Sequence, residues 1–249
     1  MVDIAVAHAS TPFVTAYPWT SAFGTKYTNP GTLPAGNGNG GAFTPSGADI
    51  AVAHSTTPFV TAYPWTSAFG TKYTNPGTLP ASTGQGVAFS PSGADIAVAH
   101  TSSPEVTVYP WSSGFGTKYT NPGTLPTGTG FYVAFTPSGA DIAVAHNTTP
   151  FITAYPWSSG FGTKYTDPGT LPAGTGQAVA FTPSGADIAV AHSTTPFVTA
   201  YPWTSAFGTK YTDPGTLPAS TGNDLAFSPL AATGPLPPFR PRIQPYAFR

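Results

Sequence analysis

Residues 49–94 read DIAVAHSTTPFVTAYPWTSAFGTKYTNPGTLPASTGQGVAFSPSGA, and this stretch decides the fold. Close copies of these 46 residues make up nearly the whole chain, and they begin at Asp3, Asp49, Asp95, Asp141 and Asp187. A period in the forties that contains several short apolar runs is typical of a β-propeller or another stacked array. The first two copies are nearly identical, which indicates recent duplication. Sameness between copies therefore does not show that a residue is needed.

Each copy contains four runs of strand length that are rich in β-branched and aromatic residues. In and beside the second copy they cover residues 87–90, 50–54, 59–63 and 71–74, and Pro- and Gly-containing turns separate them. No segment keeps the 3.6-residue period of a helix. We therefore expect an all-β fold, a single five-bladed β-propeller whose blades are four-stranded and antiparallel.

The two ends of the array fit together in register. The first copy has no apolar run before Asp3, whereas residues 225–229 repeat the run that precedes each other copy. We expect residues 225–229 to pair with residues 4–8, so that the N- and C-terminal strands share one blade and close the ring. The propeller then spans residues 1–229. Residues 230–249 form a Pro- and Arg-containing tail, either a docking segment or a run-on end.

Composition bounds the partners and the location. Charged residues make up only 7% of the chain and the net charge is −1, so no basic field exists for nucleic acid. The absence of Cys excludes disulfides and cysteine metal sites but leaves the redox compartment open. No signal peptide or long apolar run occurs, so we expect no membrane insertion. A virion-associated or a cytoplasmic location is allowed, and the oligomeric state stays open.

The unit resembles a WD40-type blade. The resemblance rests on the run Ala88-Phe89-Ser90-Pro91-Ser92-Gly93 and on the strands at residues 50–53 and 60–63. The resemblance covers about residues 3–229. The repeated unit is similar to those in the highly repetitive WD40-like arrays of bacteria and their phages. Tyr63 stands where that family has Trp, and Pro64 stands where it has Asp. The resemblance implies a propeller that is used for binding.

The repeated His and Asp residues invite metal or catalytic hypotheses, and spacing argues against both. Each copy has one His at the end of its second run, such as His54, and strand spacing should hold these residues too far apart to share a zinc ion. Asp49 begins the run that His54 ends, so the two lie too far apart for a dyad. We expect His54 to bond the adjacent Ser/Thr-rich loop and Asp49 to cap a turn. No catalytic motif is present, so the prediction is no catalytic residue, no metal, no cofactor and no enzyme.

Two further residue types recur with the period. Lys72 and its equivalents fall in the fourth run, where charge would protect an outer strand edge. Trp65 and its equivalents, each four residues before a Phe, should pack between blades, although stacking on sugars is an alternative.

The copies differ mainly in two loops, which should emerge on one face of the ring. Only the third copy has Glu105 after its Pro and Phe131-Tyr132 before its innermost strand. Loops on one face favour binding, and neutral drift is the alternative. The function expected is therefore a binding or structural platform for a protein partner, such as one on a phage or other particle surface. The alternative is a multivalent carbohydrate-binding lectin with repeated sites between blades. The candidate binding residues are Gln85, Glu105, Phe131, Tyr132, Gln177, Asn223 and Asp224.

Overall fold

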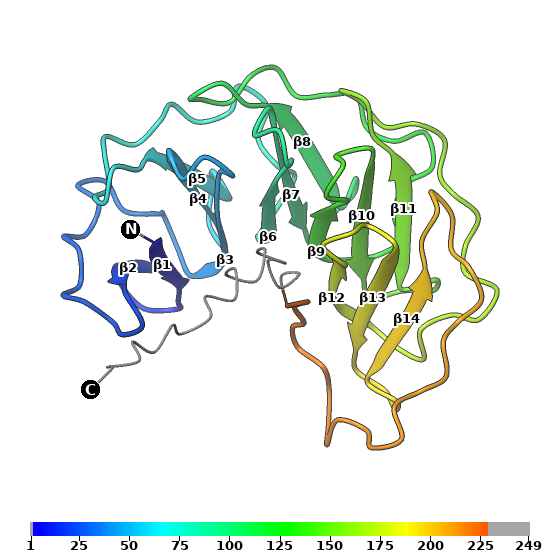
Figure 1. Cartoon of the computed structure of the whole chain (residues 1–249). Helices are drawn as coiled ribbons and strands as arrows, with labels where there is room; N and C mark the ends of the chain where they lie inside the picture. Colours follow the sequence, from blue (N-terminus) through cyan, green and yellow to red (C-terminus); the bar gives the residue numbers. More distant parts are fainter. Residues whose placement is uncertain (1, 229–249) are drawn as a thin grey trace, which may run out of the picture.

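Five antiparallel sheets follow one another in an open arc in the computed structural model, which describes residues 2–228 (Figure 1). The first sheet has two strands and the others have three. The strands are β1 (Val2–Ala7) and β2 (Val14–Trp19); β3 (Gly38–Phe43), β4 (Asp49–His54) and β5 (Val60–Pro64); β6 (Gly84–Phe89), β7 (Asp95–His100) and β8 (Val106–Pro110); β9 (Gly130–Phe135), β10 (Asp141–His146) and β11 (Ile152–Pro156); and β12 (Gly176–Phe181), β13 (Asp187–His192) and β14 (Val198–Pro202). Within residues 2–228 the structure has no helix, hence none that could cross a membrane.

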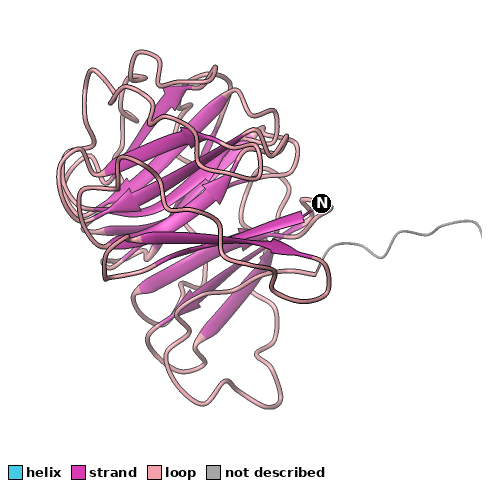
Figure 2. Cartoon of the chain, turned by 90° about the vertical axis from the view of Figure 1, so that its left-hand side faces the viewer, coloured by secondary structure: helices cyan, strands magenta, loops and turns pink. Residues whose placement is uncertain are grey.

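Each sheet is one blade, and the repeated DIAVAH run forms its middle strand. In the second blade β4 pairs with β3 on one side and with β5 on the other. All six residues of β4 are buried, because both faces of an inner blade pack against neighbouring blades. In side view the strands run through the body and the loops gather at both strand ends (Figure 2).

The core lies between blades and joins a face of small residues to a face of large ones. Ala51, Ala53 and Ala62 of the second blade pack against large side chains of the third, including Tyr109 and Trp111. The same combination recurs between the third and fourth blades and between the fourth and fifth. Each blade thus presents two different faces that fit the opposite faces of its neighbours.

The prediction of four strands per blade is wrong in one respect, because the run at residues 71–74 forms no strand. Tyr73 N donates to Ala62 O at 2.9 Å, which leaves this run with a single bond to the outer strand β5. Pro76 and Gly77 follow at once, and a proline cannot continue a hydrogen-bonded ladder. Lys72 therefore protects no strand edge, and its ammonium donates to Asn75 and to the carbonyl of Tyr73.

The predicted closing strand is not formed in this structure. Residues 225–228 lie in no strand, and within residues 2–228 β1 pairs only with β2. The sheets that carry β1 and β14 stand at the two ends of the arc, with an open gap between them (Figure 1). Residues 229–249, which include the predicted tail, lie outside the described part of the chain.

Candidate functional site

The inner strands line the concave side of the arc, and each has an irregular second residue. β3, β6, β9 and β12 pack in succession around that side (Figure 1). In β6, Gly84 lies opposite His100 and Gly86 lies opposite Ala99, so Gln85 has no partner in the ladder. The same unpaired position in the other inner strands is held by Asn39, Phe131 and Gln177. Such β-bulges re-aim a side chain and are over-represented beside active sites.

The bulge residues coincide with positions at which the copies differ. We define the inner rim as Asn39, Gln85, Phe131, Tyr132, Gln177, Asn223 and Asp224. The sequence pointed to all of these except Asn39, which lies in a Gly-rich stretch but aligns with Gln85. Tyr132 is 37% exposed. Burial, and secondly the negative charge of Asp224, raise the pKa of Tyr132. The fold thus brings Tyr132 and Asp224 within electrostatic reach of each other.

Glu105 is a buried carboxyl group in a strained turn. It is only 7% exposed, and its Oε2 has no hydrogen-bond partner within the described chain. Burial raises the pKa of Glu105. Its φ of 65° lies in the left-handed region, which a residue with a side chain rarely adopts. The equivalent residue in every other copy is Phe, with a similar φ. A carboxyl group has therefore replaced an aromatic ring in one copy alone.

The structure places Glu105 next to the aromatic pair. Glu105 belongs to the loop between β7 and β8, whereas Phe131 and Tyr132 lie in β9 of the next blade. Gly130 joins the two, because a Cβ on Gly130 would lie 2.4 Å from the Glu105 carbonyl oxygen. Only glycine permits this close approach. Although all three residues belong to the third sequence copy, they lie on the two sides of a blade boundary.

The two variable loops meet on one face, as expected. Ser55 N, after β4, donates to Asn37 O, before β3, at 3.0 Å. Thr101 N donates to Thr83 O at 3.2 Å in the next blade. Main-chain bonds therefore hold the loop before each inner strand against the loop after each middle strand.

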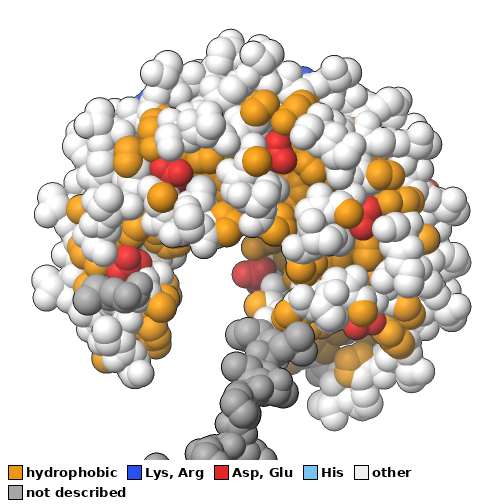
Figure 3. Space-filling view, turned by 45° about the horizontal axis from the view of Figure 1, so that its top comes forward, with side chains coloured by type: hydrophobic (Ala, Val, Ile, Leu, Met, Phe, Trp, Pro, Cys, Tyr) orange, Lys and Arg blue, Asp and Glu red, His pale blue; other side chains and the backbone are white. Residues whose placement is uncertain are grey.

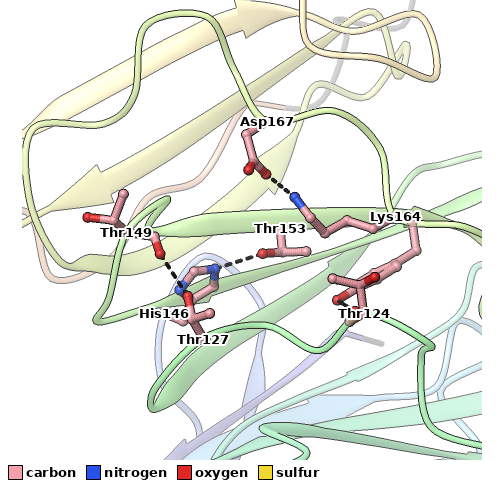
Figure 4. A network of polar contacts seen from close by, with 8 residues as sticks. Thr124, Thr127, His146, Thr149, Thr153, Lys164 and Asp167 are labelled. Atoms are coloured by element: carbon pink, nitrogen blue, oxygen red, sulfur yellow. Dashed lines mark hydrogen bonds and ion pairs between the residues drawn. The ribbon is translucent and has the colours of Figure 1, made fainter.

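The repeated histidines are internal and separate from one another. His146 Nε2 lies 2.8 Å from Thr153 Oγ1 of β11, and Thr127 Oγ1 donates to Thr149 O nearby (Figure 4). The ring Nε2 therefore bonds a strand hydroxyl, and the main chain of Thr148 in the adjacent loop also interacts with the ring. His146 and Thr153 are diagonal neighbours on one face of the sheet, so the strand hydroxyl is within reach. Burial lowers the pKa of His54, His100 and His146 to about 4. No group of three potential metal-ligating side chains occurs in residues 2–228.

The repeated Asp residues link adjacent blades, which the sequence analysis missed. Asp49 accepts a hydrogen bond from the Tyr73 hydroxyl of its own blade at 2.6 Å and one from Trp111 Nε1 of the next blade at 3.0 Å. The carboxylate thus bonds side chains instead of the predicted turn, where it is Asp49 N that donates, to Thr44 Oγ1. We call this arrangement the Asp–Tyr–Trp node. It recurs with Asp3, Asp95 and Asp141 as acceptors. Acidic side chains surrounded by apolar ones recur around the arc (Figure 3).

A small cleft lies beside these nodes. Between the third and fourth blades it measures about 220 Å³ and is lined by Asp95, Trp157, Ser92 and Ser159. The equivalent cleft between the fourth and fifth blades measures about 180 Å³. Between the first and second blades it widens to about 470 Å³. Ser159 and its equivalents have positive φ, so strained turns border the clefts.

Comparison with known proteins identifies the class of fold. No protein-family profile matches the chain, so WD40 membership is not confirmed, and no curated protein sequence matches it. A "putative 6-phosphogluconolactonase" from Bacteroides uniformis is similar in structure, with a TM-score of 0.65 and 16% identity over 84% of this chain and 66% of that one. Kuenenia stuttgartiensis hydrazine synthase has a TM-score of 0.58 and 15% identity over 77% of this chain and 57% of that one. A functionally unknown protein from Desulfotomaculum acetoxidans has a TM-score of 0.58 and 15% identity over 80% and 61%.

These likenesses show a β-propeller-like repeat protein. The chain spans about two thirds or less of the length of each of these structures. They also correct one expectation from the sequence, that the protein is not an enzyme. A fold of this kind is found in a protein described as a lactonase, so the absence of a catalytic motif does not exclude catalysis. At this level of identity the likeness establishes the fold alone.

Proposed function

We propose that the protein is a binding platform whose inner rim contacts a partner protein. One observation carries the proposal: the third copy alone combines an aromatic pair at a bulge with a buried carboxyl group that has no partner for Oε2 within residues 2–228, on a residue whose main chain approaches Gly130 next to that pair. Exposed aromatic residues are favoured interface anchors. A buried acceptor without a donor costs stability that a partner's donor would recover. Location on a phage or other particle surface remains a prediction, which co-purification with virus-like particles would test.

The chemistry of the rim indicates what such a partner presents. Glu105 and Asp224 are acceptors, whereas the inner rim as defined carries no Lys or Arg. Asn39, Gln85 and Gln177 add amide groups. A peptide segment with a cationic or N–H donor next to an apolar side chain would satisfy both the carboxylates and the aromatic pair.

Other copies of the repeat supply matched variants for the test. Phe131→Gln with Tyr132→Ala gives the residues of the fourth copy, which forms the same bulge, and Glu105→Phe gives the residue of every other copy. Peptides selected from a random display library on the wild-type protein should bind the Phe131/Tyr132 variant about 5- to 150-fold more weakly. Ser138→Ala, in a turn at the opposite strand ends, should leave binding unchanged. Equal losses from both changes, or no loss from the aromatic change, would contradict the proposal.

A second candidate function, multivalent carbohydrate binding, rests on the recurring clefts. Asp and Ser side chains line each cleft, and such groups can hydrogen-bond a polyhydroxylated ligand. Calorimetric titration with monosaccharides should then give more than one site per chain. Ser159→Gly, which removes the hydroxyl group and tolerates the positive φ, should remove one site, whereas the inner-rim variants should remove none. A stoichiometry of one, or no binding, would contradict this function.

We further propose that the platform works as a closed five-bladed ring. Two features support closure: the edge of β1 that no strand of residues 2–228 pairs with, and the match between residues 225–229 and the strand that precedes every other middle strand. Residues 225–229 would then pair with residues 4–8. Deleting residues 225–249 should lower the melting temperature, whereas an unchanged melting temperature and a monomeric mass would contradict closure.

A further inference from the structure

The end blades expose side chains whose equivalents are buried in the inner blades. Trp19 in the first blade is 38% exposed, whereas Trp65 and the three later equivalents are at most 5% exposed. Phe23 is 62% exposed, and Val6 is 43% exposed although its equivalent Val52 is fully buried. At the other end of the arc, Tyr211 and Phe227 are 47% and 36% exposed.

Trp19 lacks two partners that every other node tryptophan has. In the third blade, Trp111 donates to Asp49 of the preceding blade at 3.0 Å. The ring of Phe89, from the inner strand, lies 5.3 Å from Trp111 edge to face. Within residues 2–228, Trp19 donates to no Asp, and its own sheet has no inner strand to supply a Phe. Among the aromatic rings of residues 2–228, it packs against the neighbouring Phe23 ring alone, at 5.0 Å.

Both missing partners are present and unused at the other end of the chain. Asp187 accepts from the Tyr211 hydroxyl at 2.7 Å, but no Trp of the described chain donates to it. Each node Trp lies 62 residues after its Asp. The same step from Asp187 leads to position 249, and subtracting the 230 residues of five 46-residue repeats gives Trp19. By the same count, Phe227 is the missing counterpart of Phe89.

We propose that Trp19 and Asp187 of the same chain form a fifth Asp–Tyr–Trp node, with Phe227 packed on Trp19, and that this node joins the first blade to the last. The inference rests on the proposed closed ring and specifies the contact that holds it. The four inner interfaces already show how the two faces fit, so no new type of contact is required. The chain after β14 turns back toward the concave side of the arc (Figure 1).

The chain's own end is a better partner than a second copy because the two faces are tethered. Two faces of one chain that can reach each other meet at an effective concentration that can be of the order of millimolar. A second copy at micromolar concentration competes poorly against such a contact. Docking of a second copy head to tail would instead produce assemblies that grow with concentration.

The first test is a double-mutant cycle in the full chain. Trp19→Phe and Asp187→Asn, singly and together, are compared with Trp111→Phe and Asp49→Asn, where the node is present in the structure. We expect both cycles to show coupling in the unfolding equilibrium constant, about 2- to 150-fold. Additive effects at Trp19 and Asp187, alongside coupling at the inner node, would overturn the proposal. Coupling that appears only as mass rises with concentration would assign the contact to a second copy and would also overturn it.

Acrylamide quenching of tryptophan fluorescence separates failure of the node from failure of the ring, and it does so with conservative variants. If the node forms, Trp19 is shielded in the wild-type protein, and Asp187→Asn exposes a quenchable fraction that Trp19→Phe removes. If Asp187→Asn has no effect while deletion of residues 225–249 exposes Trp19, the ring closes without this node and the inference is wrong. If the wild-type protein already shows the quenchable fraction, the ring itself is open, and the inference fails with it.

Discussion

Lowering the pH from 7 to 5 should destabilise the protein strongly, because at least three buried histidines are held neutral in the fold. Burial lowers the pKa of His54, His100 and His146 to about 4, from an ordinary value of 6.5. Above pH 6.5 these rings are neutral in both folded and unfolded chains. Between pH 6.5 and 4 the unfolded chain binds protons that the folded chain does not, so stability falls as the pH falls.

The magnitude follows from the two pKa values. At pH 5 an unfolded histidine with a pKa of 6.5 is almost fully protonated, whereas a folded one with a pKa of about 4 is mostly neutral. The difference costs about 2 kcal/mol per histidine relative to pH 7. Three such residues cost about 5–6 kcal/mol, which is comparable with the whole stability of many domains. Each of the three fully buried rings lies in a separate blade, so their contributions to the loss of unfolding free energy should add. This holds when the whole chain unfolds together and not when single blades open one at a time.

Urea unfolding monitored by circular dichroism at pH 7, 6, 5.5 and 5 measures this loss. Near pH 5 the slope of the unfolding free energy against pH should correspond to about three protons. His146→Gln removes one titrating group and keeps a polar side chain, so its slope should fall by about one proton. A free energy that is flat between pH 7 and 5, or an uptake of less than one proton, would refute the reasoning from burial.

Three further outcomes follow from single contacts. Gly130→Ala should destabilise the protein by about 2–4 kcal/mol, because the new Cβ would lie 2.4 Å from a main-chain oxygen. Gly123→Ala should change the melting temperature little, because a Cβ there would have no atom within 4 Å. Equal shifts in melting temperature would contradict this. Thr153→Val should cost about 1–3 kcal/mol in urea unfolding by leaving His146 Nε2 unpaired, whereas exposed Thr163→Val should not. Added zinc should leave the melting temperature unchanged, because the histidines lie in separate blades and four of the five are paired with a Thr of their own blade. A saturable rise at one ion per chain would contradict this.

The repeat period and strand-sized runs sufficed to predict the class of fold and, for the inner blades, three strands each, with residues 87–90 overlapping the second half of β6. Residues 50–54 and 59–63 correspond closely to β4 and β5, because an apolar run between turn residues has few other uses. The run at residues 71–74 has the same composition, but Pro76 ends it after one ladder bond. Ring closure could not be settled from pattern alone, because it depends on the angle between blades, which no single repeat encodes.

The blade-linking nodes were missed for a different reason. Asp49 and Trp111 belong to different copies, so analysis of one 46-residue unit cannot reveal that they meet. A search for donors and acceptors at a fixed spacing longer than the repeat would have found the pair. For the inner rim, by contrast, sequence variation indicated the position and the structure supplied the cause: a bulge residue is outside the ladder, so the sheet does not constrain it.

That lack of constraint means that variation at Gln85 or Gln177 fits neutral drift as well as selection. Glu105 differs from these residues, because the fold does constrain its position. Its carboxyl group is buried, lacks a partner for Oε2, and replaces a Phe that the same turn holds in the other copies. Burial of an unsatisfied polar group costs about 1–3 kcal/mol. Violations of folding rules that persist without local compensation concentrate at functional sites. Because Glu105 adjoins the blade that carries Phe131 and Tyr132, this cost favours a selected binding site over drift in the third copy.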